Sequence, residues 1–388
     1  MNQFEPIYHA ESRPLSLWLA PNSKPAREDL ARECRVRGLV IDRDPSQAAS
    51  AIREHIAASE GVVLYLNSLK VSVDQPLGVA ILYLQQHPET PWWLVCDGIE
   101  IAEVREAESF QYLAFDQLQQ SWQLDQHSPV QIAQALLKLV FQRFMRQNAP
   151  SWLSLLATTQ TAAPAKGAHL ALDWSDWTQD YAIDNAAWPV IQQALIDVKN
   201  VIVGQAIERL LILPQVHLTA ALLIGATFNT RVDGPTQMWV SNRFNNALTW
   251  WNCNAQGTAH GLKTQTSMLN QGQAVSMEWA ITQPVAKVIQ PIERYIERQL
   301  QQQLKQRNLY AKADQQRFDI ESSLQASALA HFFRSELLAQ ASPLVHLFAA
   351  MPAALAVCFG RQLNACPPLQ CYELKGYTDY EPSWIIRV

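Results

Sequence analysis

The chain has 388 residues, 48% of them hydrophobic and 17% charged, with a formal net charge of -5. It is too long for one ordinary domain, so we expect two or three. The acidic balance argues against a dedicated binder of duplex nucleic acid, which would need a basic face, but it allows a small nucleotide ligand.

Strand and helix patterns alternate along the first part of the chain. They predict a mainly parallel, flavodoxin-like α/β domain over residues 1–147, with helices on both faces of the sheet. The next segment, 148–167, is poor in charge and rich in Ala, Thr, Ser and Pro, which is typical of a linker. The expected strands are 16–20, 39–41, 61–66 and 91–97; the expected helices are 26–37, 45–59, one after Pro76, and 128–146.

A second region of alternating patterns runs over residues 168–388. We expect strands in 169–177, 236–242, 274–281, 371–377 and 381–388, the last as an edge strand, and helices at 187–199, 285–305 and 327–340. The polar segment 245–273 predicts an irregular or hairpin insertion.

Two stretches of the second region, 211–229 and 346–364, are copies of one strand-loop-helix pattern. Aligned without a gap, Ala221, Gly225 and Asn229 match Ala356, Gly360 and Asn364. A short buried strand followed by a turn and a helix N-terminus presents free backbone N–H groups that can hold an anion such as phosphate. We therefore expect duplicated halves that share one cleft, although any α/β fold repeats such units.

The N-terminus lacks the basic and apolar run of a signal peptide, and no stretch is long and apolar enough to span a bilayer, so we expect a cytoplasmic protein without a membrane partner. The cysteines form no CxxC pair, which favours buried thiols over a disulfide framework or a metal site. There is also no GxxxxGK[ST], HExxH or GxSxG motif.

The run VHLFAAMPAALAVCFGRQLNACPPLQCYELKGYTDYEPSWII resembles the C-terminal signature of SAVED domains, the sensor modules of bacterial antiphage systems. The resemblance extends over about residues 165–388. It implies two fused CARF-like Rossmann halves, in keeping with the internal repeat. It also implies a cyclic oligonucleotide activator, with cyclic tri-adenylate expected, and self-association into an oligomer or filament that switches on an effector, in a CBASS or type III CRISPR setting.

The first 145 residues resemble a TIR domain in the order of elements. TIR effectors hydrolyse NAD with a glutamate about six residues after a serine; here Ser72 is followed by VDQPLG, so that Gly78 occupies the position of the carboxylate. Cleavage of the bond to nicotinamide needs a carboxylate beside an oxocarbenium-like ribose. Asp74 is the nearest candidate, at a different spacing. NAD as a substrate and a degenerate, scaffold-like domain both remain open.

The ligand needs donors for its phosphates and flat or hydrogen-bonding surfaces for its bases. Trp250 could stack a base, although tryptophans more often serve packing, and Arg361 could instead make a structural pair. His217 and His346 are expected to be core histidines. The expected ligand-binding residues are Pro214, Gln215, Trp250, Thr282, Gln283, Phe348, Ala349, Ala350, Met351, Pro352 and Arg361.

The sequence therefore predicts an antiphage sensor whose TIR-like domain hydrolyses NAD once a cyclic oligonucleotide drives assembly. One alternative is a ligand-sensing scaffold without catalysis that recruits or activates a partner effector. Another is a nucleotide-binding metabolic protein with an accidental likeness.

Overall fold

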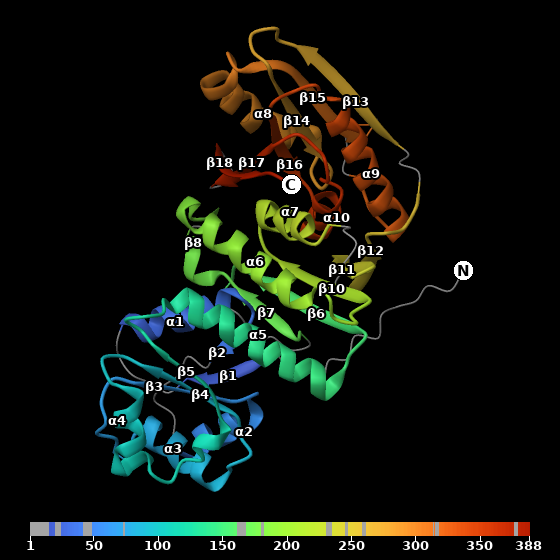
Figure 1. The fold of residues 1–388 in the computed structure, drawn as a ribbon. Helices are drawn as coiled ribbons and strands as arrows, with labels where there is room; N and C mark the ends of the chain where they lie inside the picture. Colours follow the sequence, from blue (N-terminus) through green and yellow to red (C-terminus); the bar gives the residue numbers. More distant parts are fainter. Residues whose placement is uncertain are drawn as a thin grey trace. The chain divides into compact units, whose positions relative to one another are not determined.

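The computed structural model describes residues 15–19, 25–41, 49–72, 74–160, 168–179, 182–229, 235–244, 247–257, 261–312, 314, 318–375 and 379–388 (Figure 1). The chain divides into two compact units. The N-terminal unit contains residues 9–149 and 164–173, and the C-terminal unit contains residues 150–163 and 174–388. Within the described residues, none of the helices combines the length and apolarity that crossing a membrane requires.

The N-terminal unit is built on a five-stranded sheet in the order β2-β1-β3-β4-β5, in which every neighbouring pair is parallel. All residues of β3 and β4 are buried, as expected for central strands covered on both faces. The strands are β1 (Ser16–Leu19), β2 (Val40–Ile41), β3 (Val62–Leu66), β4 (Trp92–Cys96) and β5 (Leu118–Gln123), and β7 (Leu170–Asp173) also belongs to this unit.

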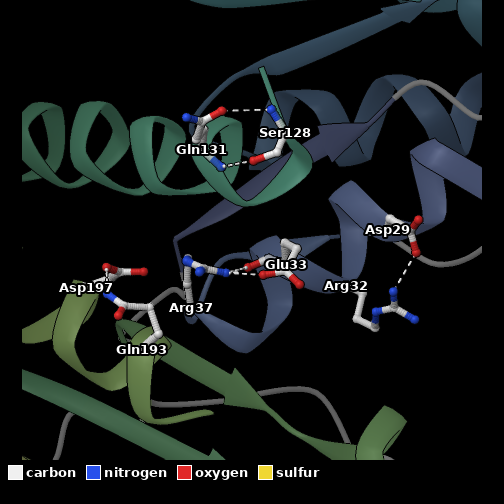
Figure 2. Close-up of polar contacts among 8 residues, drawn as sticks. All are labelled: Asp29, Arg32, Glu33, Arg37, Ser128, Gln131, Gln193 and Asp197. Atoms are coloured by element: carbon white, nitrogen blue, oxygen red, sulfur yellow. Dashed lines mark hydrogen bonds and ion pairs between the residues drawn. The ribbon is translucent and has the colours of Figure 1, made fainter. Parts of the chain in front are cut away.

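Local side-chain interactions support α1 and α5 of the N-terminal unit. Figure 2 shows the capping box of α5, in which the backbone N–H of Gln131 donates to Ser128 Oγ and the N–H of Ser128 donates to Gln131 Oε1. The same figure shows two ion pairs along α1, Asp29–Arg32 and Glu33–Arg37. The helices are α1 (Pro25–Val36), α2 (Ala49–Ala58), α3 (Pro76–Gln86), α4 (Ile101–Glu106) and α5 (Pro129–Asn148), with 3₁₀ turns at Glu108–Phe110 and Phe115–Gln117.

The C-terminal unit contains two sheets. The first has the order β12-β11-β10-β6 within this unit, and the second has the order β13-β15-β14-β16-β17-β18. The strands are β6 (Trp152–Thr158), β10 (Arg209–Gln215), β11 (Gln237–Phe244), β12 (Ala247–Asn252), β13 (Leu262–Met268), β14 (Ala274–Ala280), β15 (Leu304–Lys312), β16 (Val345–Ala350), β17 (Leu369–Lys375) and β18 (Asp379–Ile386), with a small hairpin of β8 (Thr178–Gln179) and β9 (Ala182–Ile183).

The helices of the C-terminal unit cover these sheets. The α6 helix carries the Gln193–Asp197 hydrogen bond drawn in Figure 2, one turn apart on the helix surface. The helices are α6 (Trp188–Ile202), α7 (Leu218–Thr227), α8 (Val285–Tyr295), which continues as a π-helical turn over Ile296–Leu300, α9 (Ser323–Ala339) and α10 (Ala353–Arg361), with 3₁₀ turns at Ser175–Trp177 and Asn185–Ala187.

The two predicted copies take equivalent positions in the two sheets. We call each sheet with its helices a lobe. In the first lobe, β10 lies parallel between β6 and β11, and β12 follows antiparallel to β11. In the second lobe, β16 lies parallel between β14 and β17, and β18 follows antiparallel to β17. The helices correspond as well, since α6 precedes β10 and α9 precedes β16, while α7 and α10 follow. The repeat read from the sequence is therefore a repeat of topology.

The helices α7 and α10 pack against each other at the two matched glycines. A Cβ atom on Gly225 would lie 2.1 Å from the carbonyl oxygen of Val357, and one on Gly360 would lie 2.0 Å from that of Leu222. The backbones thus approach more closely than any side chain allows. Both helices are buried over most of their length.

Three expectations differ from the structure, and the first concerns segment 245–273, expected as an irregular or hairpin insertion, which contains β12 and β13 in two different sheets. Residues 152–158, placed in the linker, form β6, a largely buried strand that pairs in parallel with β10 (residues 161–167 lie outside the described part). The helix expected over 285–305 ends at Tyr295 and its π-helical extension at Leu300, and residues 304–312 form β15. In residues 152–158 and 304–312, pairing with neighbouring strands decides the structure more than local propensity does.

Substitution Gly225→Ala tests the contact between the helices. The added methyl group meets backbone rather than a flexible side chain, so we expect the free energy of unfolding to fall by roughly 1–3 kcal/mol or more, as for an overpacked core. Chemical denaturation measures the change. Thr227→Ala, two residues further along α7, adds no atom and should cost less; equal losses in the two variants would contradict the close approach.

Candidate functional site

The loops singled out by the repeat lie at the carboxyl ends of paired strands in both lobes. Gln215 ends β10, and its carbonyl accepts a hydrogen bond from the N–H of Thr159, 3.1 Å away, just after β6. Ala350 is its counterpart at the end of β16, and its carbonyl accepts a bond of 2.9 Å from the N–H of Thr282, just after β14. Ligands of open parallel sheets bind outside such strand ends.

The predicted loop residues of the second lobe therefore lie together. Gln283 is exposed, while Thr282, Ala349, Ala350, Met351 and Pro352 are half-buried. Pro352 is the N-cap residue of α10, which begins at Ala353 rather than at Met351, so the first free N–H groups belong to residues 353 and beyond.

Phe348 contributes packing rather than a ligand surface. Its side chain is fully buried, and its ring stacks on Tyr372 with 4.3 Å between the centroids. It also contacts Tyr295 and Tyr380, in the core beneath α8. In the first lobe the matching stretch is more open, because Pro214 is half-buried and Gln215 is exposed.

A hydrogen bond joins the start of α7 in the first lobe to the second lobe. The N–H of Thr219, in the first turn of α7, donates to Oε1 of Glu373 on β17 at 3.3 Å. Cys371, two residues before Glu373 on the same face of β17, pairs in register with Leu347 of β16. The start of α7, just after Gln215, therefore lies against β17, the neighbour of β16, and β16 ends at the second loop.

Glu373 is an acidic group in a poorly hydrated place. Burial raises the pKa of its carboxyl group to about 7, although its hydrogen bonding with Thr219 acts in the opposite direction. Glu373 also borders a pocket of about 230 Å³ between β9, β17 and β18. The lining residues are Ala182, Ile183, Asp184, Asn185, Glu373, Leu374, Lys375, Glu381, Pro382 and Ser383. Lys375 within it is paired with Glu381 at 3.2 Å.

Two predicted ligand residues lie apart from the strand-end loops. Arg361 is at the opposite end of α10 from Pro352, is 3% exposed, and donates from Nη1 to the carbonyl of Phe228 at 3.1 Å. It therefore caps the C-terminal end of α7. Trp250 lies on the edge strand β12, opposite Ser241, and its carbonyl accepts a bond from Ser323 at the start of α9.

His346 is a core histidine, as expected, whereas His217 is half-buried at the start of α7. His346 is buried, its Nδ1 lies 2.7 Å from Tyr372 Oη, and burial lowers its pKa to about 4. His217 is the N-cap residue of α7, and burial lowers its pKa as well. Both are therefore neutral near pH 7, which suits packing and hydrogen bonding rather than anion binding.

The N-terminal unit offers little of a hydrolytic site around the segment that follows β3. Gly78 is buried inside α3 and supplies no carboxylate. Ser72 and Asp74 are exposed in the loop before the helix. Among the described residues, no group of three or more His, Cys, Asp or Glu side chains is arranged to hold a metal ion.

Sequence reasoning missed Thr159 and Gln160, because their segment was read as a linker. A signal for them existed: Ala157–Gln160 reads ATTQ and Ala280–Gln283 reads AITQ, one at the end of β6 and one at the end of β14. Thr159 is 6% exposed and Gln160 is exposed.

Residues 195–386 match the family model described as "SMODS-associated and fused to various effectors sensor domain", abbreviated SAVED. This part of the chain is a SAVED domain. It begins in the middle of α6 and runs to the end of β18, while β6, although part of the same fold unit, lies before the matched residues.

The solved structures that resemble the chain include Cap4 SAVED/CARF-domain-containing receptors. The Acinetobacter baumannii receptor, solved with the cyclic trinucleotide 3'3'3'-cAAA, has 13% identity and a TM-score of 0.46, covering 84% of this chain and 88% of that one. The Moraxella osloensis receptor has 12% identity and a TM-score of 0.46, covering 89% and 87%. No curated protein sequence matches the chain.

Substitution Glu373→Gln tests the buried carboxyl group. Its pKa is raised in the folded state, so its stabilising contribution is complete below the usual pKa of about 4.5 and is lost as the pH rises through about 7. We therefore expect the variant to equal the wild type near pH 4.5 and to exceed its unfolding free energy by up to about 3 kcal/mol above pH 7. Urea denaturation across this range measures it. A difference independent of pH would contradict the raised pKa.

Proposed function

We propose that the chain is an antiphage sensor whose SAVED domain binds a cyclic oligonucleotide at the strand-end loops of its two lobes, with cyclic tri-adenylate as the first ligand to test. The observation that carries the proposal is the matched placement of Gln215 and Ala350, each bonded to the turn that follows the neighbouring strand. The SAVED match adds the class of protein, a sensor domain.

The chemistry of the loops suits a cyclic ligand with several phosphates. Backbone N–H groups at the start of α10 have no intrahelical partners and can donate to an anion. The exposed amides of Gln160, Gln215 and Gln283 can both donate and accept hydrogen bonds, which base edges require. A site built from neutral donors also agrees with the net charge of -5, since it needs no basic patch.

Calorimetry with cyclic tri-adenylate tests this site. Removing one hydrogen-bonding amide, as in Gln283→Ala, should weaken binding about fivefold, since a hydrogen bond contributes roughly 1 kcal/mol. Gln302→Ala removes an equally exposed amide in the turn before β15 and should bind as the wild type does. Absence of binding by the wild type, across a panel of cyclic oligonucleotides, would instead favour a nucleotide-binding metabolic protein.

For residues 1–147 we propose a TIR-like effector domain. The sheet order β2-β1-β3-β4-β5 supports it, because this is the order of flavodoxin-like, doubly wound sheets. We propose that the sensor domain, expected from the sequence as residues 168–388, also includes β6, whereas β7 (Leu170–Asp173) falls in the N-terminal unit. Ligand binding would drive self-association that brings effector domains together, in a soluble, cytoplasmic protein.

The N-terminal domain either hydrolyses NAD or acts as a scaffold for a partner effector, and one observation favours the scaffold. Gly78 is buried in α3, where the carboxylate of an NAD-cleaving TIR domain is expected, and only the exposed Asp74 is near it in the sequence. A carboxylate in water stabilises a developing positive charge far less than one held in a closed site.

An assay of NAD consumption, with cyclic tri-adenylate bound, separates these roles. We expect no loss of NAD above that of a protein-free control. If NAD is consumed, Asp74 is the group to test: Asp74→Asn would abolish the activity if its carboxylate is catalytic, whereas Asp116→Asn, an exposed control in the same unit, would leave it unchanged.

A further inference from the structure

The strand β13 forms one edge of the six-stranded sheet in the second lobe. It pairs antiparallel with β15, from Leu262 opposite Lys312 to Met268 opposite Gln306, and among the described residues it has no other partner strand. Figure 1 shows β13 as the outermost strand of this sheet. Along the outer edge, the N–H and C=O groups of alternate residues are therefore available to a further strand.

This edge lacks the usual protections against pairing. Proteins commonly block an exposed edge with proline, a bulge, several charges or a covering segment. The register of β13 with β15 runs without a bulge, the strand has no proline, and Lys263 is its one charged residue. Its residues are exposed on both faces apart from the half-buried Leu262, and Met268 is 53% exposed.

The sequence of β13, LKTQTSM, complements itself when two copies run antiparallel about Gln265. In that register Leu262 of one copy lies opposite Met268 of the other, so both ends make an apolar pair. Thr264 lies opposite Thr266, a favourable cross-strand pair. Lys263 lies opposite the neutral Ser267, so no like charges meet.

We propose that β13 is a self-association surface, through which two copies of this chain pair as antiparallel strands around a two-fold axis at Gln265 and join their six-stranded sheets into one. Such a contact uses the same surface on both copies and therefore closes as a dimer. This pairing needs no ligand, so it is separate from the ligand-driven self-association in the proposed function and does not rest on it.

Charge placed on the axis tests the pairing. In Gln265→Lys and in Gln265→Glu, two like charges face each other across the axis, and each variant alone should dimerise at least tenfold more weakly than the wild type. An equimolar mixture of the two places opposite charges there and should restore association. Sedimentation velocity of the full chain, without nucleotide and up to about 100 µM, measures the dimer.

Gln302→Lys is the matched control, because this exposed glutamine precedes β15 and lies outside β13. It should associate as the wild type does. The inference fails if the wild type stays monomeric over the whole range, if Gln265→Lys associates as strongly as the wild type, or if the mixture shows no recovery. Calorimetry with cyclic tri-adenylate on the same variants measures ligand binding separately. A loss of dimerisation is therefore distinguishable from a loss of ligand binding.

Discussion

The contact between α7 and α10 determines how the C-terminal unit is built. Two glycines at matched positions, Gly225 and Gly360, let the backbones of the two helices approach to a distance that any side chain would prevent. Each helix follows the central strand of its own lobe, so this one contact sets the spacing of the two sheets. The contact therefore also determines the positions of the two loops that precede these helices, and these loops carry the candidate site.

Around this contact the two lobes are similar in topology but differ in chemistry. At the start of α7, the second lobe supplies an acceptor, Glu373, to a helix of the first. A carboxylate at a helix N-terminus is favourable in water, yet burial here works against its charge and raises the pKa to about 7.

Much of this architecture could be predicted from the sequence, because apolar strands and glycine spacing are local signals. The two copies, the central strands β3, β4 and β14, and the edge strand β18 follow from such patterns. The strand β15 could not be predicted, since the polar segment after Leu300 continues a helical spacing and becomes a strand only by pairing with β13 and β14. The turn at Thr159 was missed because the short apolar strand β6 is followed at once by a run rich in alanine and threonine, which gives the whole segment the composition of a linker.

The guanidinium group of Arg361 makes the two copies of the repeat chemically different. In the gapless alignment its counterpart in the first copy is Ala226, which carries no donor. Arg361 closes the carbonyl end of α7, but nothing equivalent reaches back from Ala226 toward α10. A hypothetical protein made of two first copies would leave Phe228 without this donor. The two copies are thus complementary rather than interchangeable at this position, although Ala221, Gly225 and Asn229 still match Ala356, Gly360 and Asn364.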